Sequence, residues 1–299
     1  MKTLAAIVLA MASGAHAGNE IVWRACDSST NAIMAGVAST YQNGECTFVN
    51  TTGDATGAIV AAGSGQVDFG FTNRAALPGE SGLGVHFTVV AWDALVPITN
   101  SANPVRSISA AELGAILSGE ITNWSEVGGQ NAPIEVFVRE SRSSGVGTMT
   151  RTMFFHDEDA NYGGNLQPVR QNVENSVENN PYAIAMTTYS IARHCGSQML
   201  AIDGVQPTTR TIASGEYPYY MPLYLAHRED LSSNCQEFLT WITGPEGQRT
   251  LSATGVVTLR DGASLVAQYE FWSDREFVAN YESLMQNANG FAAVETIEE

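Results

Sequence analysis

Three polar segments of this chain carry side chains that could bind an anion. They are Asp27–Thr30, Thr51–Thr56 and Ser141–Gly145, and each combines hydroxyl groups with small residues. Each precedes a stretch predicted to be helical, and the first turn of a helix offers unpaired backbone N–H groups and a partial positive charge. Arg139, just before the third segment, could add a bidentate contact. Ordinary helix capping would explain any one of these segments, so the indication of an anion site rests on all three together.

The composition of the chain excludes several other classes of function. The 299 residues include 14 basic and 31 acidic side chains, which give a net charge of −17. This charge has the wrong sign for a nucleic-acid partner and disfavours an anionic membrane surface. Lys2 is the only lysine, so P-loop and Schiff-base lysine mechanisms are excluded. No residue pattern indicates a metal or a cofactor, and an anion would have to be held by arginine, hydroxyl and backbone N–H groups.

The N-terminus has the pattern of an exported protein. Lys2 is followed by the apolar run 4–12 and by Ala15-His16-Ala17, which fits a signal-peptidase site. The run is too short to span a bilayer as an anchor. We expect residues 1–17 to be a signal peptide that is cleaved near Ala17 and directs the protein to the periplasm.

Export would allow the four cysteines to form disulfides. Of the possible pairings we favour Cys195–Cys235, because both residues are predicted to lie in loops. A Cys26–Cys46 bridge would have to join the end of one strand to the start of a parallel neighbour, a geometry that disulfides do not favour.

Strand and helix patterns alternate along the chain and predict an α/β fold. Predicted strands cover 21–25, 47–50, 67–71 and 134–138, and predicted helices cover 31–42, 58–63, 109–117, 146–155, 235–243 and 246–254. Such alternation is typical of a doubly wound, mostly parallel sheet, in which ligands bind at the carboxyl ends of the strands. Two longer apolar runs, 86–99 and 218–226, are candidates for connections that cross between two lobes.

Several segments resemble the periplasmic phosphate-binding proteins of ABC importers. In family order they are Val67–Arg74, Ile108–Leu117, Ile121–Gly129, Val138–Gly145, Ile202–Pro207, Ile212–Leu225 and Gly244–Gln248. The resemblance implies the venus-flytrap fold of type II periplasmic binding proteins, in which each of two lobes is a mostly parallel sheet flanked by helices. Lobe I would comprise residues 18–92 and 221–299, and lobe II residues 93–220. It implies a protein without enzymatic activity that captures inorganic phosphate in the interlobe cleft and delivers it to an ABC permease in the inner membrane. We expect it to be a monomer.

The resemblance also implies which residues bind the anion. They are Ser29, Thr30, Thr52, Asp54, Asn73, Arg139, Ser143, Ser144 and Gly145, with Thr52 and Asp54 as alternatives for one hydroxyl position. Two features depart from the family pattern. Asn73 stands where many relatives have an aspartate that accepts the proton of hydrogen phosphate, and Asp54 is a possible replacement for that acceptor. The sequence Ser144-Gly145-Val146 lacks the last hydroxyl of the family's Ser-Gly-Thr signature.

Three alternatives remain at this point. Asn73 can donate to a fully deprotonated oxygen, so sulfate or molybdate could replace phosphate as the ligand. A secreted phosphatase-like hydrolase on the same fold is a second alternative, although the chain has neither a G-x-S-x-G nor an H-E-x-x-H pattern. A third is an extracellular sensor that uses residues 271–299 as a docking helix.

Overall fold

The computed structural model describes most of the chain between residues 20 and 268. The described ranges are 20–26, 28–41, 47–139, 141–169 and 172–268. Three expectations lie outside them: the signal peptide, any bridge to Cys46, and the docking role of residues 271–299.

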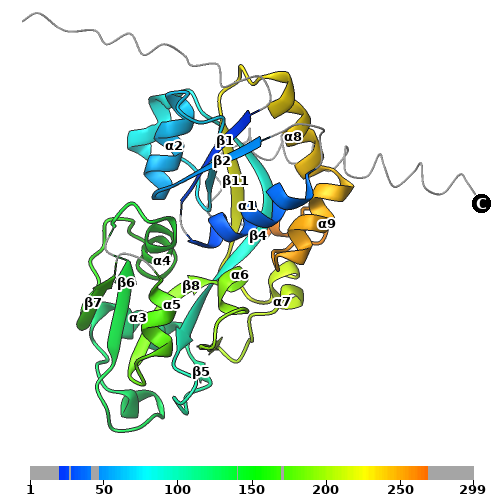
Figure 1. Cartoon of the computed structure of the whole chain (residues 1–299). Coiled ribbons are helices and arrows are strands. Elements are labelled where there is room, and N and C mark those ends of the chain that lie inside the picture. The colour runs from blue at the N-terminus through cyan, green and yellow to red at the C-terminus, as the bar shows by residue number, and fades with distance from the viewer. Residues whose placement is uncertain (1–19, 27, 42–46, 140, 170–171, 269–299) are drawn as a thin grey trace, which may run out of the picture.

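Strands and helices alternate along most of the chain (Figure 1). The strands are β1 (Glu20–Ala25), β2 (Thr47–Thr52), β3 (Phe69–Thr72), β4 (His86–Thr99), β5 (Ser107–Ile108), β6 (Glu135–Arg139), β7 (Asn165–Val169), β8 (Ala183–Thr188), β9 (Gln198–Met199), β10 (Ala201–Ile202) and β11 (Tyr220–His227). The helices are α1 (Ser28–Thr40), α2 (Ala55–Gly63), α3 (Ala110–Ser118), α4 (Gly145–Phe155), α5 (Val173–Glu178), α6 (Tyr189–Ala192), α7 (Thr209–Ala213), α8 (Ser233–Thr243), α9 (Pro245–Ala253) and α10 (Leu265–Gln268), with 3-10 helices η1 (Pro78–Leu83) and η2 (Trp124–Val127).

One continuous sheet is shared by two lobes. Its strand order is β2-β1-β3-β11-β4-β8-β6-β7, and β9 also pairs with β4. β4 pairs with β11 up to Ala94 and with β8 from Leu95 onwards, so the sheet divides at this point. Lobe I contains β1, β2, β3, α1, α2, α8 and α9, and lobe II contains α3, α4, α5, β6, β7 and β8 (Figure 1). β4 carries the chain into lobe II and β11 returns it to lobe I.

The two-lobed α/β fold that the sequence predicted is confirmed, and the structure refines the strand directions. β1, β2 and β3 are mutually parallel, as are β6, β7 and β8. β11 is antiparallel to β3 and β4, and β4 is antiparallel to β8. The two crossing strands follow from the predicted apolar runs 86–99 and 218–226. Because they run in opposite directions, the centre of the sheet is antiparallel and only its outer strands are parallel.

The helices near the predicted site begin earlier than the sequence pattern indicated. α1 begins at Ser28 rather than at residue 31, and α2 begins at Ala55 rather than at residue 58. The capping box predicted at Ser109 and Glu112 is confirmed, since Ser109 Oγ accepts from the Glu112 N–H and the Glu112 carboxylate accepts from the Ser109 N–H. The earlier start of α1 and α2 brings the first helical turns directly to the ends of β1 and β2.

The predicted Cys195–Cys235 disulfide is wrong. Cys195 has a free thiol, and burial together with the charges of Glu174 and Glu178 raises its pKa to about 11. Cys235 lies in α8, in the lobe I core with Phe238. The assumption that Cys235 lies in a loop was wrong, because it is the third residue of α8, which covers the helix predicted over 235–243.

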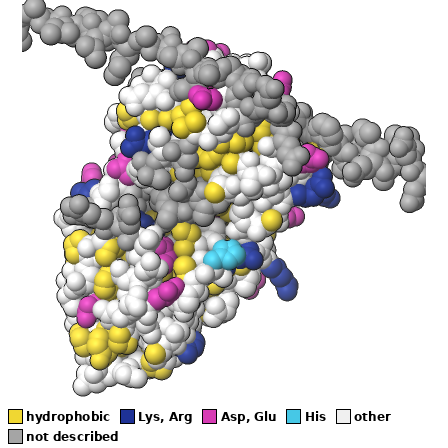
Figure 2. All heavy atoms as spheres, viewed as in Figure 1, with side chains coloured by type: hydrophobic (Ala, Val, Ile, Leu, Met, Phe, Trp, Pro, Cys, Tyr) yellow, Lys and Arg dark blue, Asp and Glu magenta, His cyan; other side chains and the backbone are white. Residues whose placement is uncertain are grey.

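Figure 2 shows the charged side chains on one face of the molecule. On the face shown in Figure 2, the Lys and Arg side chains of the described residues form no basic patch, and acidic side chains are scattered between them. Within the described ranges, no helix combines the length and apolar character needed to cross a membrane.

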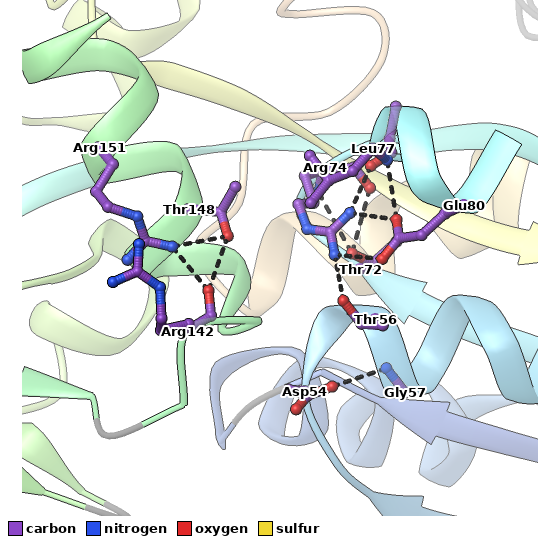
Figure 3. Close-up of polar contacts among 11 residues, drawn as sticks. Asp54, Thr56, Gly57, Thr72, Arg74, Leu77, Glu80, Arg142, Thr148 and Arg151 are labelled. Atoms are coloured by element: carbon purple, nitrogen blue, oxygen red, sulfur yellow. Dashed lines mark hydrogen bonds and ion pairs between the residues drawn. The ribbon is translucent and has the colours of Figure 1, made fainter. Parts of the chain in front are cut away.

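A buried ion pair fixes the loop after β3. The Arg74 guanidinium donates to the Glu80 carboxylate at 2.7 and 2.9 Å and to Thr56 Oγ1 at 2.9 Å (Figure 3). Burial raises the pKa of Glu80, but hydrogen bonds from Arg74 and from the Leu77 N–H outweigh it and hold that pKa below its ordinary 4.5. The pair is therefore ionised at neutral pH and holds the loop, with Asn73 at its start, against α2.

Glu80→Gln is expected to lower the free energy of unfolding by about 3–5 kcal/mol, because it leaves the Arg74 charge buried without its counter-ion. Asp230→Asn is the control: its pair with Arg228 is 2.9 Å long, but the two side chains are 36% and 76% exposed. Asp230→Asn should lower the free energy of unfolding by less than about 1 kcal/mol. Urea denaturation of both variants measures the difference, and equal losses would contradict a structural role for the buried pair.

Candidate anion-binding site

The carboxyl ends of β1, β2 and β3 lie together at one edge of lobe I. In the parallel register Ala25 is opposite Thr52, and β3 pairs with the other side of β1. The starts of α1 and α2 and the side chain of Asn73 therefore come from neighbouring points. The predicted residues Ser29 and Thr30 fall in the first turn of α1, and Thr52 ends β2. The side chains of these three residues lie outside the described part of the structure.

Asn73 is fully buried between the two lobes. It follows β3 and has 0% of its surface exposed, and the Cys26 thiol lies 3.8 Å from its Oδ1. The same oxygen packs against Gly145 of lobe II so closely that a Cβ on that glycine would overlap it. Asn73 Nδ2 has no hydrogen-bond partner within the described part of the chain. A buried amide donor without an acceptor costs free energy, which makes Nδ2 a candidate donor to a ligand oxygen.

The N-terminus of α4 lies beside Asn73. The helix begins at Gly145, and Ser144 caps it by accepting from the Gly147 N–H at 3.4 Å. The first N–H groups of an α-helix have no acceptor within the helix, and the helix dipole adds a partial positive charge there. Ser144 is 4% exposed and Gly145 is buried, so this positive end lies away from bulk water. A buried amide donor beside such a helix end is suited to binding an anion.

The loop that precedes α4 is anchored by two arginines (Figure 3). Arg151, which is buried, donates to the Arg142 carbonyl at 2.7 Å and to the Glu158 carbonyl at 2.6 Å. Arg142 donates in turn to the Asp159 carbonyl at 2.6 Å. These bonds fix the backbone between Ser141 and Ser144, and with it the direction of the hydroxyl groups that face lobe I.

Asp54 lies on the lobe I side of this contact and carries a negative charge. It caps α2, with Oδ1 accepting from the Gly57 N–H at 2.7 Å, while Oδ2 accepts from Ser143 Oγ at 2.5 Å and from Ser141 Oγ at 3.1 Å. Burial raises the pKa of Asp54, but these three hydrogen bonds and the charge of Arg24 outweigh it and hold the pKa below 3.8. Asp54 is thus an ionised carboxylate bonded to both lobes.

Arg139 has partners inside lobe II. Its guanidinium donates to the Met186 carbonyl at 3.0 Å and to Glu174 Oε1 at 3.1 Å, and its side chain is 14% exposed. Glu174 also accepts from the hydroxyl of Thr187. The Arg139 side chain, which the sequence predicted to contact the anion, is therefore held in a buried ion pair between β6, β8 and α5.

Sequence reasoning did not identify Arg24 or Glu174 as parts of this region, and it named Ser141 only as the start of the polar segment Ser141–Gly145. The Arg24 side chain lies against Gly53 and Gly57, where an added Cβ would crowd its guanidinium, and its Nε is buried without a partner among the described residues. The glycines on either side of Asp54 were a usable signal, because they leave room for a large side chain. Which side chain fills that room depends on the pairing of β1 with β2. No group of three or more His, Cys, Asp or Glu that could hold a metal occurs in the described ranges.

This chain belongs to the family of PBP superfamily domains, whose family model matches residues 13–246. Among curated proteins it is similar to the phosphate-binding protein PstS of Bacillus subtilis (strain 168), with 27% identity over 161 residues, 53% of this chain and 53% of that protein. It is also similar to the phosphate-binding protein PstS of Borreliella burgdorferi, with 26% identity over 187 residues, 59% of this chain and 67% of that protein. The match with the Bacillus protein thus spans about half the length of that relative.

Solved structures agree with the fold. A phosphate ABC transporter substrate-binding protein with bound phosphate from Clostridium perfringens has a TM-score of 0.73 and 23% identity, and the match covers 80% of this chain and 99% of that chain. An ABC-type phosphate transport receptor from Vibrio cholerae has a TM-score of 0.65, also with 23% identity and coverages of 80% and 99%. At these identities the likeness establishes the two-lobed fold, and the binding properties of this chain must be argued from its own residues.

Gly145→Ala tests the close approach of the two lobes. The added Cβ would overlap Asn73 Oδ1, so we expect a larger radius of gyration in X-ray solution scattering and weaker oxyanion binding. Gly147→Ala is the matched control, because it lies in the same helix and its Cβ would meet Arg151 Nη1 at an ordinary 3.4 Å. Both substitutions favour helix formation to a similar extent. Indistinguishable behaviour of the two variants would rule out the Asn73–Gly145 contact in solution.

Proposed function

We propose that this protein is an exported, monomeric solute-binding protein that captures inorganic phosphate between its two lobes and delivers it to an ABC permease. The observation that carries the proposal is the buried donor Asn73 Nδ2, which has no acceptor among the described residues and lies beside the N-terminus of α4. The phosphate-binding names of the relatives support the choice of phosphate and of an importer as the partner. The lobes that close on the ligand are residues 18–92 with 221–299, and residues 93–220.

The proposed ligand contacts come from both lobes. Lobe I supplies Asn73 together with the first turn of α1, where Ser29 and Thr30 lie, and the end of β2 at Thr52. Lobe II supplies the hydroxyls and backbone N–H groups at Ser143, Ser144 and Gly145, and Arg139 adds positive charge from behind them. These groups are hydrogen-bond donors, which is what a tetrahedral oxyanion requires.

The proposed site binds its ligand without catalysing a reaction. A general base works best when its pKa lies near the working pH. Asp54 is the acidic side chain at the interlobe contact, and its pKa lies below 3.8, so it is too weak a base to activate water at neutral pH. The remaining side chains proposed to face the ligand are amide, hydroxyl and guanidinium groups. Transport rather than phosphatase chemistry is therefore the function that this arrangement supports.

Asn73 also supports a second candidate ligand. An amide N–H can donate to a fully deprotonated oxygen, whereas a carboxylate at the same place would accept the proton of hydrogen phosphate. Sulfate and molybdate, which present no proton at neutral pH, are therefore the competing oxyanions.

The proposal is tested by isothermal titration of the mature protein, stripped of bound ligand by unfolding and refolding, with phosphate, sulfate and molybdate in turn. Tight binding of phosphate is the expected result. A preference for sulfate or molybdate would reassign the ligand to the second candidate. An absence of heat with all three anions, from protein whose circular dichroism shows it to be folded, would reject an oxyanion function.

Two substitutions at Asn73 separate the loss of a donor from a change of specificity. Asn73→Leu removes the amide and should weaken oxyanion binding by roughly ten- to a hundredfold, the value of one hydrogen bond to a charged group. Asn73→Asp has nearly the same shape but carries an acceptor, so it should lose sulfate and retain binding of the protonated phosphate ion. Titrations near neutral pH measure both effects, and unchanged affinities would remove Asn73 from the site.

Arg139→Ala is expected to weaken phosphate binding by about 1.5–3 kcal/mol. The same substitution leaves Glu174, which is 4% exposed, without its counter-ion, so it should also destabilise the fold. The double variant Arg139→Ala/Glu174→Gln removes that unpaired charge and should recover stability while affinity stays low. Affinity equal to that of the wild type in the double variant would assign Arg139 a purely structural role.

A further inference from the structure

The contact between the lobes contains an anion that belongs to the protein itself. The Asp54 carboxylate is bonded to a backbone N–H of lobe I and to the hydroxyls of Ser143 and Ser141 in lobe II. The two hydroxyls also lie 2.9 Å from each other. This is the kind of donor set that an oxyanion would use: a helix N-terminus on one side, serine hydroxyls on the other, and an arginine nearby. The donors surround an internal carboxylate.

A backbone hydrogen bond joins the same two segments as the bonds of Asp54. The N–H of Ala55, the first residue of α2, donates to the Ser143 carbonyl at 3.2 Å. Ser143 is thus held to the start of α2 through both its side chain and its backbone. The contact therefore crosses between the lobes.

We infer that Asp54 is a built-in competitor for the bound anion: it holds the lobes together through Ser141 and Ser143, and the ligand must take Ser143 from it. The inference rests on the proposed function for the identity of the competing anion. Competition follows from two physical facts. A serine hydroxyl has a single proton to donate, so Ser143 cannot serve Asp54 and a ligand at once. A second negative charge beside the Asp54 carboxylate is also repelled.

The competition reduces the apparent affinity for the anion. When a fraction of the molecules is held in a state that cannot bind, the apparent dissociation constant rises in proportion. Asp54 therefore sets the concentration range in which the protein responds to its ligand, although it does not select which ligand binds. Arg24 opposes this effect partially, because its charge acts on the carboxylate from the lobe I side.

The decisive variant is Asp54→Ser. Serine retains the ability to cap α2, so the helix should remain intact, while the charge and the bonds to lobe II are lost. We expect the variant without added oxyanion to have a larger radius of gyration than the wild type in solution scattering. We also expect it to bind phosphate about tenfold more tightly in isothermal titration. Ser141→Ala, which weakens the same contact from an exposed position, should change both quantities in the same direction but by less.

Asp230→Ser is the charge-matched control, since it removes one exposed carboxylate from lobe I and should leave both quantities unchanged. Weaker phosphate binding by Asp54→Ser would overturn the inference and make Asp54 a ligand contact. An unchanged radius of gyration would overturn it as well. If Asp54→Ser opens the lobes while neither protein binds phosphate, sulfate or molybdate, the interlobe contact stands and the proposed oxyanion function fails. If both proteins bind phosphate equally, with equal radii, the proposed function stands and the inference fails.

Discussion

A buried hydrogen-bond donor must be given an acceptor, and the amide of Asn73 is the donor on which the arrangement of the two lobes depends. Its oxygen packs against Gly145 of lobe II, so the lobes meet at a distance that a larger residue would forbid. Its nitrogen is left without a hydrogen-bond partner among the described residues. The Arg74–Glu80 ion pair holds the loop that follows Asn73, and the bonds of Arg151 hold the loop that precedes α4. The segments that meet at Asn73 and Gly145 are thus each held in place by bonds within their own lobe.

The sequence predicted most of the helices and strands around the candidate site, because each is marked by the pattern of its own neighbouring residues. The apolar run of β4 and the capping box at Ser109 needed only neighbouring residues to be recognised. β8 was missed because all six of its residues are buried, which removes the alternation that marks a half-buried strand. The cysteine pairing failed for a related reason, since the burial of α8 depends on contacts with the rest of lobe I.

The candidate site was predicted only as a set of residues, without their mutual contacts. Asn73, Asp54 and Ser143 could be selected from the resemblance, but their pairing crosses between lobes and has no signature in the sequence. Asp54 illustrates the difference. Its type and position suggested an acceptor for a ligand proton, whereas its contacts are serine hydroxyls of the opposite lobe. Charge and hydrogen-bond partners together, rather than residue type alone, determine what such a carboxylate can do.

The two connections between the lobes are strands of one sheet, and this determines how the lobes can move. β4 and β11 remain hydrogen-bonded to each other up to Ala94 and Tyr220, where the chain passes from one lobe to the other, and their register shifts between Leu223 and Tyr224. Any relative movement of the lobes has to pass through this pair of hydrogen-bonded strands. A movement that keeps these strands paired costs little backbone entropy, because their residues are already ordered in the sheet. The two lobes are thus joined by paired strands of one sheet and not by separate flexible loops.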